Sequence, residues 1–220
     1  MVTVIIPALN EQEWIERSVR SAIDAGAAEV IVADGGSTDA TARRATAAGA
    51  RVLLAAPPRG TQLNTAAAVA SHDHIIFLHA DTMLPPGACE AVRDALGRVA
   101  FGGFRIAFAE PAFKLRVAAA MINLRTRLTR CPWGDQAQFI RRDVFRESGG
   151  FRDMPIMEDY EIAQRMRGRG RVALLPLAVT TSGRRFLRKG VLRTAITNWS
   201  IIFSYRRGTP ADELARAYRK

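Results

Sequence analysis

The first hundred residues alternate between short apolar runs and segments in which apolar residues recur at helical spacing. Runs of β-branched and aliphatic residues have the length of buried strands, at residues 3–6, 29–33, 51–56 and 74–78. After the first run, Ile15, Val19 and Ala22 recur at intervals of four and three residues, which predicts an amphipathic helix. Apolar, Ala-rich segments at residues 38–48 and 61–70 predict two further helices.

Polar residues and glycine mark where these elements begin and end. Asn10 and Glu13 have the spacing of a capping pair before the first helix, and Gly26 predicts its end. Ser37 or Asp39 is positioned to cap the second helix. Strands that alternate with helices through short links predict an α/β fold with a doubly wound, mostly parallel sheet.

The alternation becomes looser in the second half of the chain. The pattern predicts helices at 88–96 and 113–130, strands at 101–108, 138–141 and 172–175, a short helix from Glu158 and a long final helix at 187–205. No repeat or linker divides the chain, which predicts one domain over residues 1–220. Within it we distinguish residues 1–100, residues 101–182 and a basic amphipathic segment, 183–220.

The composition suits a globular domain that binds anions. Of the 220 residues 48% are hydrophobic, which is enough for a sizeable core. The net charge of +11 and pI near 11 favour nucleotide phosphates, nucleic acid or an anionic membrane as partners. Cys89 and Cys131 lie far apart without metal-ligand spacing, which predicts buried thiols in a reducing cytoplasm. The amino terminus lacks the features of a signal peptide, so we expect no export.

Carboxylates follow two of the predicted strands. Asp81 comes just after the fourth strand, and Asp34 begins a Gly-containing turn after the second. Taken singly, each has an ordinary explanation as a turn residue. Because parallel strands end at the same edge of a sheet, we expect residues 7–11, 34–39 and 79–82 to share one rim, where ligands bind.

Three segments in this order resemble the successive signatures of the family 2 glycosyltransferases, which have the GT-A fold. They are VIIPALNE at residues 4–11, IVADGGSTD at 31–39 and FLHADT at 77–82. The resemblance implies a nucleotide-diphosphate sugar as donor, a UDP- or GDP-sugar, bound by residues 1–100. It implies nucleotide contacts from Pro7, Asn10, Glu11, Asp34, Arg59, Asn64 and His79. It also implies that Asp81 ends the family's DxD motif and binds Mg²⁺ or Mn²⁺.

Two positions depart from the family pattern. Gly35 stands where a second acid is usual, and His79 stands where the DxD motif usually begins. The last Asp of that motif is the more direct metal ligand in the family. Mg²⁺ needs only one or two protein carboxylates when phosphate oxygens complete its coordination, so Asp81 can suffice. For His79 three roles stay open: a contact to the ribose, a contact to the metal, or one hydrogen bond in a turn.

The second half must supply the acceptor site and a base. Asp159 shares a helical face with Ile162 and Met166, so we expect it to point inward. Glu158 and Glu161 are expected on the wetter side, where acids in a first turn complement the helix dipole. The segment MEDYE resembles the family's ED motif, which implies Asp159 as the general base. The resemblance further implies acceptor contacts in residues 101–182 from Trp133, Asp135, Gly149, Gly150, Phe151 and Glu158.

The carboxyl-terminal segment combines basic clusters with an apolar run at residues 195–203 that contains Trp199. This run is too short to cross a bilayer. Two interpretations stay open: a basic helix that lies on an anionic membrane, and a helix that closes the core with a solvated basic rim. The first interpretation predicts an acceptor linked to a lipid, and a cytoplasmic enzyme peripheral to the inner membrane face.

Three hypotheses for the whole protein follow. The first is an inverting, metal-dependent glycosyltransferase with an unidentified acceptor, similar to short bacterial family members found beside radical-SAM and seleno-related genes. The second is a sugar nucleotidyltransferase, which is disfavoured because the loop after the first strand lacks a Gly-rich, basic phosphate loop. The third is a basic module that binds membrane or nucleic acid. Nucleic acid is disfavoured because aromatic residues are not interleaved with the basic clusters.

Overall fold

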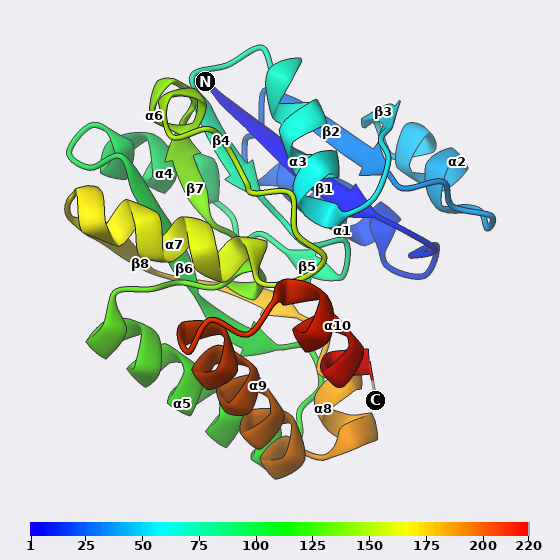
Figure 1. Cartoon of the computed structure of the whole chain (residues 1–220). Coiled ribbons are helices and arrows are strands. Elements are labelled where there is room, and N and C mark those ends of the chain that lie inside the picture. The colour runs from blue at the N-terminus through cyan, green and yellow to red at the C-terminus, as the bar shows by residue number, and fades with distance from the viewer. Residues whose placement is uncertain (220) are drawn as a thin grey trace.

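In the computed structural model, which describes residues 1–219, helices cover both faces of an eight-stranded sheet (Figure 1). The strands are β1 (Val2–Ala8), β2 (Glu29–Asp34), β3 (Arg51–Leu54), β4 (His74–Phe77), β5 (Thr82–Met83), β6 (Phe101–Phe108), β7 (Phe139–Arg141) and β8 (Val172–Thr181). They lie in the order β3-β2-β1-β4-β7-β6-β8-β5. Strands β3, β2, β1 and β4 pair in parallel, as do β6 and β8, whereas β7 and β5 are antiparallel to their neighbours. The predicted α/β, mostly parallel sheet is confirmed.

The helices form a layer on each face of the sheet. They are α1 (Ile15–Asp24), α2 (Thr41–Ala47), α3 (Arg59–Ala68), α4 (Ala88–Leu96), α5 (Phe113–Thr129), the 3-10 helix η1 (Gly134–Gln136), α6 (Arg142–Glu147), α7 (Glu158–Arg169), α8 (Arg184–Lys189), α9 (Val191–Arg206) and α10 (Ala211–Arg219). Val4 and Ile6 of β1 pack in the layer of α1, α2 and α4, while Ile5 packs in the layer of α3, α6 and α7. All three are fully buried, and each such side chain contributes about 2 kcal/mol of burial free energy. The central strand thus anchors both layers.

Several helix starts differ from the sequence prediction. Helix α1 begins at Ile15 with no side-chain cap, so the predicted capping pair of Asn10 and Glu13 is wrong. Helix α2 begins at Thr41 instead of residue 38, because Asp39 accepts a hydrogen bond from the N–H of Thr41 (2.9 Å). Helix α3 begins at Arg59, two residues before its predicted start. The earlier start places Arg59 in the first turn.

The carboxyl-terminal part differs more. The predicted single helix at 187–205 is wrong: Gly190, with φ of 84°, separates α8 from α9, and a third helix, α10, follows. Glycine adopts this left-handed conformation without the steric cost that a Cβ imposes. Strand β8 extends to Thr181, beyond the predicted end at residue 175, and the short elements β5 and α6 were not predicted. Two- and six-residue elements are too short to show a periodic pattern.

The two cysteines are buried free thiols, as predicted. Burial raises the pKa of Cys89 and of Cys131 to about 11, so both stay protonated and unreactive at neutral pH. The described part of the chain thus contains no disulfide.

Candidate active site

The loops after β1 and β2 are hydrogen-bonded to each other. Asn10, with φ of 55°, accepts a bond from the N–H of Thr38 on its Oδ1 and donates its own N–H to Ser37 Oγ, both at 2.9 Å. Asp34 is 5% exposed and accepts bonds from the N–H groups of Gly36 and Ser37 and from the Ser37 hydroxyl. The predicted donor residues of these loops therefore lie on one rim with fixed geometry.

Gly35, which stands where the family usually has a second acid, packs against Gln62 of α3. A Cβ built on Gly35 would lie 2.2 Å from Nε2 of Gln62, a residue of α3 that is 6% exposed. Gln62 thus occupies the space that an acidic side chain at position 35 would need.

Asp81 and Glu11 share one guanidinium group. Nη2 of Arg184, the first residue of α8, lies 2.6 Å from Glu11 Oε1 and 3.4 Å from Asp81 Oδ2. Burial raises the pKa of Asp81, and Glu11 adds to this, while Arg184 opposes it. The other oxygen of Glu11, Oε2, is buried and has no hydrogen-bond partner. The two loops that carry these acids therefore do meet at one rim.

The carboxylates of Glu11 and Asp81 could supply some, but not all, of the oxygen ligands of a hard divalent cation. Mg²⁺ and Mn²⁺ prefer oxygen ligands, and the unpartnered Oε2 of Glu11 next to Asp81 offers such a donor. Residues 1–219 contain no group of three or more side chains that could hold a metal by itself. A cation here would therefore need further ligands, such as phosphate oxygens.

Arg59 connects three of the predicted site residues. Its Nε bonds the carboxylate of Glu158, its Nη1 lies 3.3 Å from His79 Nε2, and its Nη2 lies 3.8 Å from Asp159 Oδ2. Burial, with the charge of Arg59, lowers the pKa of His79 to about 3, so the imidazole is neutral at physiological pH. Of the three roles open for His79, the structure contains the hydrogen bond, which it makes to Arg59.

Asp159 is held by backbone groups at the start of α7. Its Oδ2 accepts the N–H of Gly134 (2.8 Å), and its Oδ1 accepts the N–H of Tyr160 (2.7 Å). A Cβ on Gly134 would lie only 2.7 Å from both Asp159 Oδ2 and His79 Nε2, so glycine alone fits there. The Asp159 side chain is 22% exposed and borders a small cavity with Pro7, His79 and Gly134. A fixed carboxylate that solvent still reaches can accept a proton.

The orientation expected for the neighbouring glutamates is wrong. Glu158 is 2% exposed and Glu161 is 7% exposed, so both are more buried than Asp159. Glu158 is paired with Arg59, and Glu161 with Arg165 at 2.8 Å. Helical periodicity placed them on the polar side, but ion pairs allow them to be buried: Arg59 of α3 pairs with Glu158, and Arg152 joins Arg165 on Glu161. The carboxylate of Glu158 holds Arg59, which is a different contact from the acceptor contact that the resemblance implied.

The turn that contains η1 is covered by a residue of α5. The guanidinium carbon of Arg125 lies 3.4 Å from the ring centre of Trp133, and its Nη2 donates to Gln136 (3.0 Å). Oδ1 of Asp135 is buried without a hydrogen-bond partner. Burial raises the pKa of Asp135 to about 6, with Arg125 opposing the shift and Asp159 adding to it. The turn thus places a carboxylate with a raised pKa two residues from Trp133.

The Gly149-Gly150 turn joins the two halves of the chain. Asn64 of α3 donates to the carbonyl of Phe151 (2.8 Å) and accepts its N–H (2.9 Å). Gly149 and Gly150 have φ of 83° and 67°, and a Cβ on Gly150 would lie 2.5 Å from Asn64 Oδ1. The ring of Phe151 is 3% exposed and packs 4.8 Å from that of Phe77. The Asn64 amide and the Phe151 ring therefore support the site from within the fold, whereas the resemblance implied substrate contacts for both.

Three residues of this region were missed by sequence reasoning: Arg184, Arg125 and Gln138. Gln138 donates to the backbone carbonyl of Asp159 at 2.7 Å. Arg184 and Arg125 lie in stretches rich in arginine, where no local pattern distinguishes one arginine from the next. For Arg184 one signal existed, since acids predicted to share a rim require a neighbouring cation.

The sheet order and this site together define a class of enzyme. A parallel half that carries the rim of Asn10, Asp34 and Asp81, joined through β7 to a mixed half that carries Asp159, is the architecture of a GT-A glycosyltransferase. The chain matches the model of "Glycosyl transferase family 2" over residues 3–154. It belongs to this family, as the sequence motifs predict.

Curated relatives align with part of the chain. Glucosyl-3-phosphoglycerate synthase of Mycobacterium tuberculosis is 36% identical over 96 residues, which are 38% of this chain and 30% of that protein. The succinoglycan biosynthesis protein ExoA of Rhizobium meliloti is 38% identical over 105 residues, 42% of this chain and 32% of its own. This chain spans about a third of the length of these relatives.

Solved structures with a similar fold cover more of the chain. TarS of S. aureus in complex with UDP-GlcNAc has a TM-score of 0.64 at 14% identity, over 82% of this chain and 58% of that one. The M. tuberculosis glucosyl-3-phosphoglycerate synthase, in complex with Mn²⁺, UDP and glucosyl-3-phosphoglycerate, has a TM-score of 0.58 at 21% identity. The match covers 96% of this chain and 81% of that one. The mannosyltransferase PcManGT of Pyrobaculum calidifontis, in complex with GDP-Man and Mn²⁺, has a TM-score of 0.61 at 20% identity. The match covers 82% of this chain and 56% of that one. These likenesses establish the fold.

Proposed function

We propose that the protein transfers a sugar from a nucleotide-diphosphate sugar to an acceptor hydroxyl, with inversion at the anomeric carbon and with a divalent metal. The observation that carries the proposal is the position of Asp159. Its carboxylate is fixed by the N–H of Gly134, lies near Arg59 and still reaches solvent. The family assignment favours this function over a sugar nucleotidyltransferase or a non-enzymatic basic module.

In the proposed reaction Asp159 takes the proton of the acceptor hydroxyl. As that proton moves to Oδ1 or Oδ2, the acceptor oxygen forms its bond to the anomeric carbon and the bond to the diphosphate breaks. One displacement from the opposite side inverts the configuration of that carbon. General-base assistance of this kind contributes about 10²–10⁴ in rate. Arg59 holds the site by pairing with both Glu158 and Asp159.

The leaving diphosphate collects negative charge, which must be neutralised. Asp81 and Glu11 would hold Mg²⁺ or Mn²⁺, which as a Lewis acid stabilises the departing phosphate. Arg184 lies between the same two carboxylates and can turn its guanidinium to the diphosphate oxygens. His79, neutral beside Arg59, adds no charge of its own.

The donor nucleotide is proposed to lie on the rim formed by Pro7, Asn10, Glu11 and Asp34, with the sugar pointing toward Asp159. Relatives of the same fold bind UDP, UDP-GlcNAc or GDP-Man, so UDP- and GDP-sugars are the donor candidates. The acceptor would bind near Trp133 and Asp135.

The test is a panel of UDP- and GDP-sugars, each with and without Mn²⁺, in which released nucleoside diphosphate is measured. We expect slow metal-dependent hydrolysis of one donor. Asp81→Asn should abolish metal-dependent donor binding, whereas Asp159→Asn should leave donor binding intact and lower turnover about 10³-fold.

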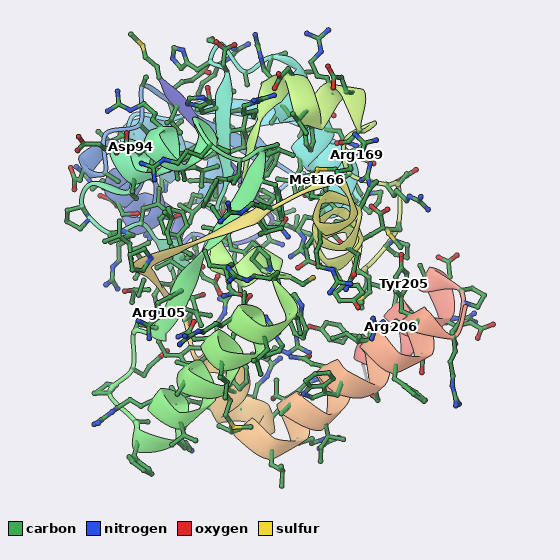
Figure 2. All side chains as sticks on the ribbon, turned by 90° about the vertical axis from the view of Figure 1, so that its left-hand side faces the viewer. Asp94, Arg105, Met166, Arg169, Tyr205 and Arg206 are labelled. Carbon is green, nitrogen blue, oxygen red and sulfur yellow. The ribbon has the colours of Figure 1, made fainter. Side chains whose placement is uncertain are left out.

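Asp94→Asn is the matched control, because Asp94, labelled in Figure 2, is an exposed acid on α4, a helix that supplies none of the site residues. It should leave both binding and turnover unchanged. Near-normal transfer by Asp159→Asn would contradict the assignment of the base. Release of pyrophosphate from a nucleoside triphosphate and a sugar phosphate would instead support a nucleotidyltransferase.

A further inference from the structure

Two helices at one end of the molecule each carry a row of exposed apolar side chains. On α5 the row is Phe113, Val117, Met121, Leu124 and Leu128, and on α9 it is Leu192, Ile196, Trp199 and Phe203. Each of these residues is between 42% and 74% exposed. Their spacing of three and four residues places each row along one face of its helix, opposite the buried face.

The two helices that carry these rows are neighbours. Helices α5 and α9 pack against each other, and both views show them side by side at the end of the molecule farthest from β3 and α2 (Figures 1 and 2). We call the two rows, with the exposed basic residues beside them, the α5–α9 surface. Single exposed apolar residues are common on proteins, but a continuous apolar patch indicates a binding surface.

All charged residues on the two segments that carry the rows are basic. Residues 111–133 contain Lys114, Arg116, Arg125, Arg127 and Arg130, and residues 183–210 contain Arg184, Arg185, Arg188, Lys189, Arg193, Arg206 and Arg207. Neither range contains Asp or Glu. The partner of this surface must therefore combine an apolar phase with negative charge.

A second copy of the chain does not meet that requirement. In a twofold dimer the same patch faces itself, so arginines and lysines would meet arginines and lysines. An anionic bilayer supplies both parts: acyl chains for the apolar rows and anionic headgroups for the basic residues. Trp199 and Phe203 suit the interface between these two zones.

We propose that the α5–α9 surface docks on an anionic lipid bilayer. Within residues 1–219 no helix has the length and hydropathy needed to cross a membrane. The same helices reach the candidate site, because Arg125 of α5 covers Trp133, and α8, which precedes α9, carries Arg184. If the proposed transferase function holds, an acceptor anchored in that bilayer would be presented to Asp159.

The test is sedimentation of the full chain with vesicles of phosphatidylcholine, with and without about 30% phosphatidylglycerol. We expect binding at least tenfold tighter to the anionic vesicles, and a marked loss between about 0.1 M and about 0.5 M salt. Brominated acyl chains should quench Trp199, and the Trp199→Phe variant should lose that part of the quenching.

Paired variants separate the two contributions. Trp199→Gln with Phe203→Gln should weaken binding about tenfold or more. Arg193→Gln with Arg206→Gln should weaken it roughly 25-fold, since each basic residue near the surface contributes roughly fivefold. The matched control is Leu54→Gln with Arg43→Gln, exposed residues at the opposite end, which should change nothing. Circular dichroism checks that each variant is folded.

Three outcomes would overturn the proposal. One is equal affinity for neutral and anionic vesicles, and another is no binding to either. The third is a stable dimer that the Trp199→Gln and Phe203→Gln changes dissociate. Because vesicle binding is measured without substrates, a failed glycosyltransferase assay leaves this test unaffected.

Discussion

The two sides of the candidate site are held in place by different interactions. On the donor side, Asn10, Ser37 and Asp34 join neighbouring loops by bonds between side chains and backbone, each worth about 1 kcal/mol. On the acceptor side, Arg59 pairs with the buried Glu158 across almost a hundred residues of sequence. Breaking a buried ion pair costs several kcal/mol. The donor side should therefore tolerate single substitutions that the acceptor side does not.

The largest effect on stability is expected for Arg59→Met. The change leaves Glu158, which is 2% exposed, as an unpaired buried charge, so the free energy of unfolding should fall by about 3 kcal/mol. Urea denaturation measures this. The double variant Arg59→Met with Glu158→Met should recover most of the loss, since it leaves no unpaired charge. A loss below about 1 kcal/mol for the single change would contradict the comparison.

Next in size is the effect of Gly134→Ala on catalysis. The new Cβ would lie 2.7 Å from both Asp159 Oδ2 and His79 Nε2, so the base must shift. We expect a loss of about 100-fold in kcat, because a misplacement of about 1 Å can cost that much. Gly168→Ala, on α7 with no atom within 4 Å of its Cβ, is the control and should keep full activity. Equal kcat values for the two variants would show that Gly134 does not position Asp159.

Asp135→Asn should raise stability in a pH-dependent manner. The pKa of Asp135 is about 6 in the folded protein, above the ordinary 3.8, through burial beside Asp159 and Asp81 with Arg125 opposing. The wild type therefore loses stability as the pH rises from about 4 to about 6, whereas Asn does not titrate. Above pH 7 the variant should be more stable by roughly 3 kcal/mol, and below about pH 4 the two should coincide. Chemical denaturation at pH 4 and pH 7.5 tests this; a constant difference at both pH values would refute it.

The smallest effect is expected on the donor side, from Ser37→Ala. The change removes the hydroxyl that bonds both Asp34 and Asn10, at a cost of about 2 kcal/mol in unfolding free energy. Donor affinity should fall only a few-fold, which calorimetry with the donor nucleotide can measure. Thr46→Ala, which removes a hydroxyl bonded within α2, serves as the control. If Ser37→Ala lowered the free energy of unfolding as much as Arg59→Met does, the donor and acceptor sides would not differ in their tolerance of substitution.

The sequence predicted the first half of the fold well because its signals are local. Buried parallel strands such as β1 and β2 read as apolar runs, and the glycines at 26 and 49 end helices where the structure has φ of 90° and 102°. The rim was predictable for the same reason, since each of its acids directly follows a strand. The short β5 and α6, and the break at Gly190, carried no such pattern and were missed.

The acceptor side was predicted less completely because its geometry depends on distant contacts. Periodicity placed Glu158 and Glu161 toward solvent, and it carries no sign of Arg59 and Arg152, which lie outside α7 and pair with the two buried acids. Likewise Asn64 was expected at the nucleotide, but the fold brings Phe151 against its amide. The assignments of individual residues to donor, metal and acceptor stay predictions for the assays above.

By itself the sequence determined the α/β class, the family and the acids that line the rim, because these depend on short segments with their own periodicity and motif. The tertiary structure alone decided that Arg184 bridges Glu11 and Asp81, that Gly134 lies against both His79 and Asp159, and that α5 and α9, which carry the apolar rows, pack against each other. These contacts join residues that are far apart in the chain, so no local pattern encodes them. These contacts form only in the folded chain, where the two core layers pack on opposite faces of β1.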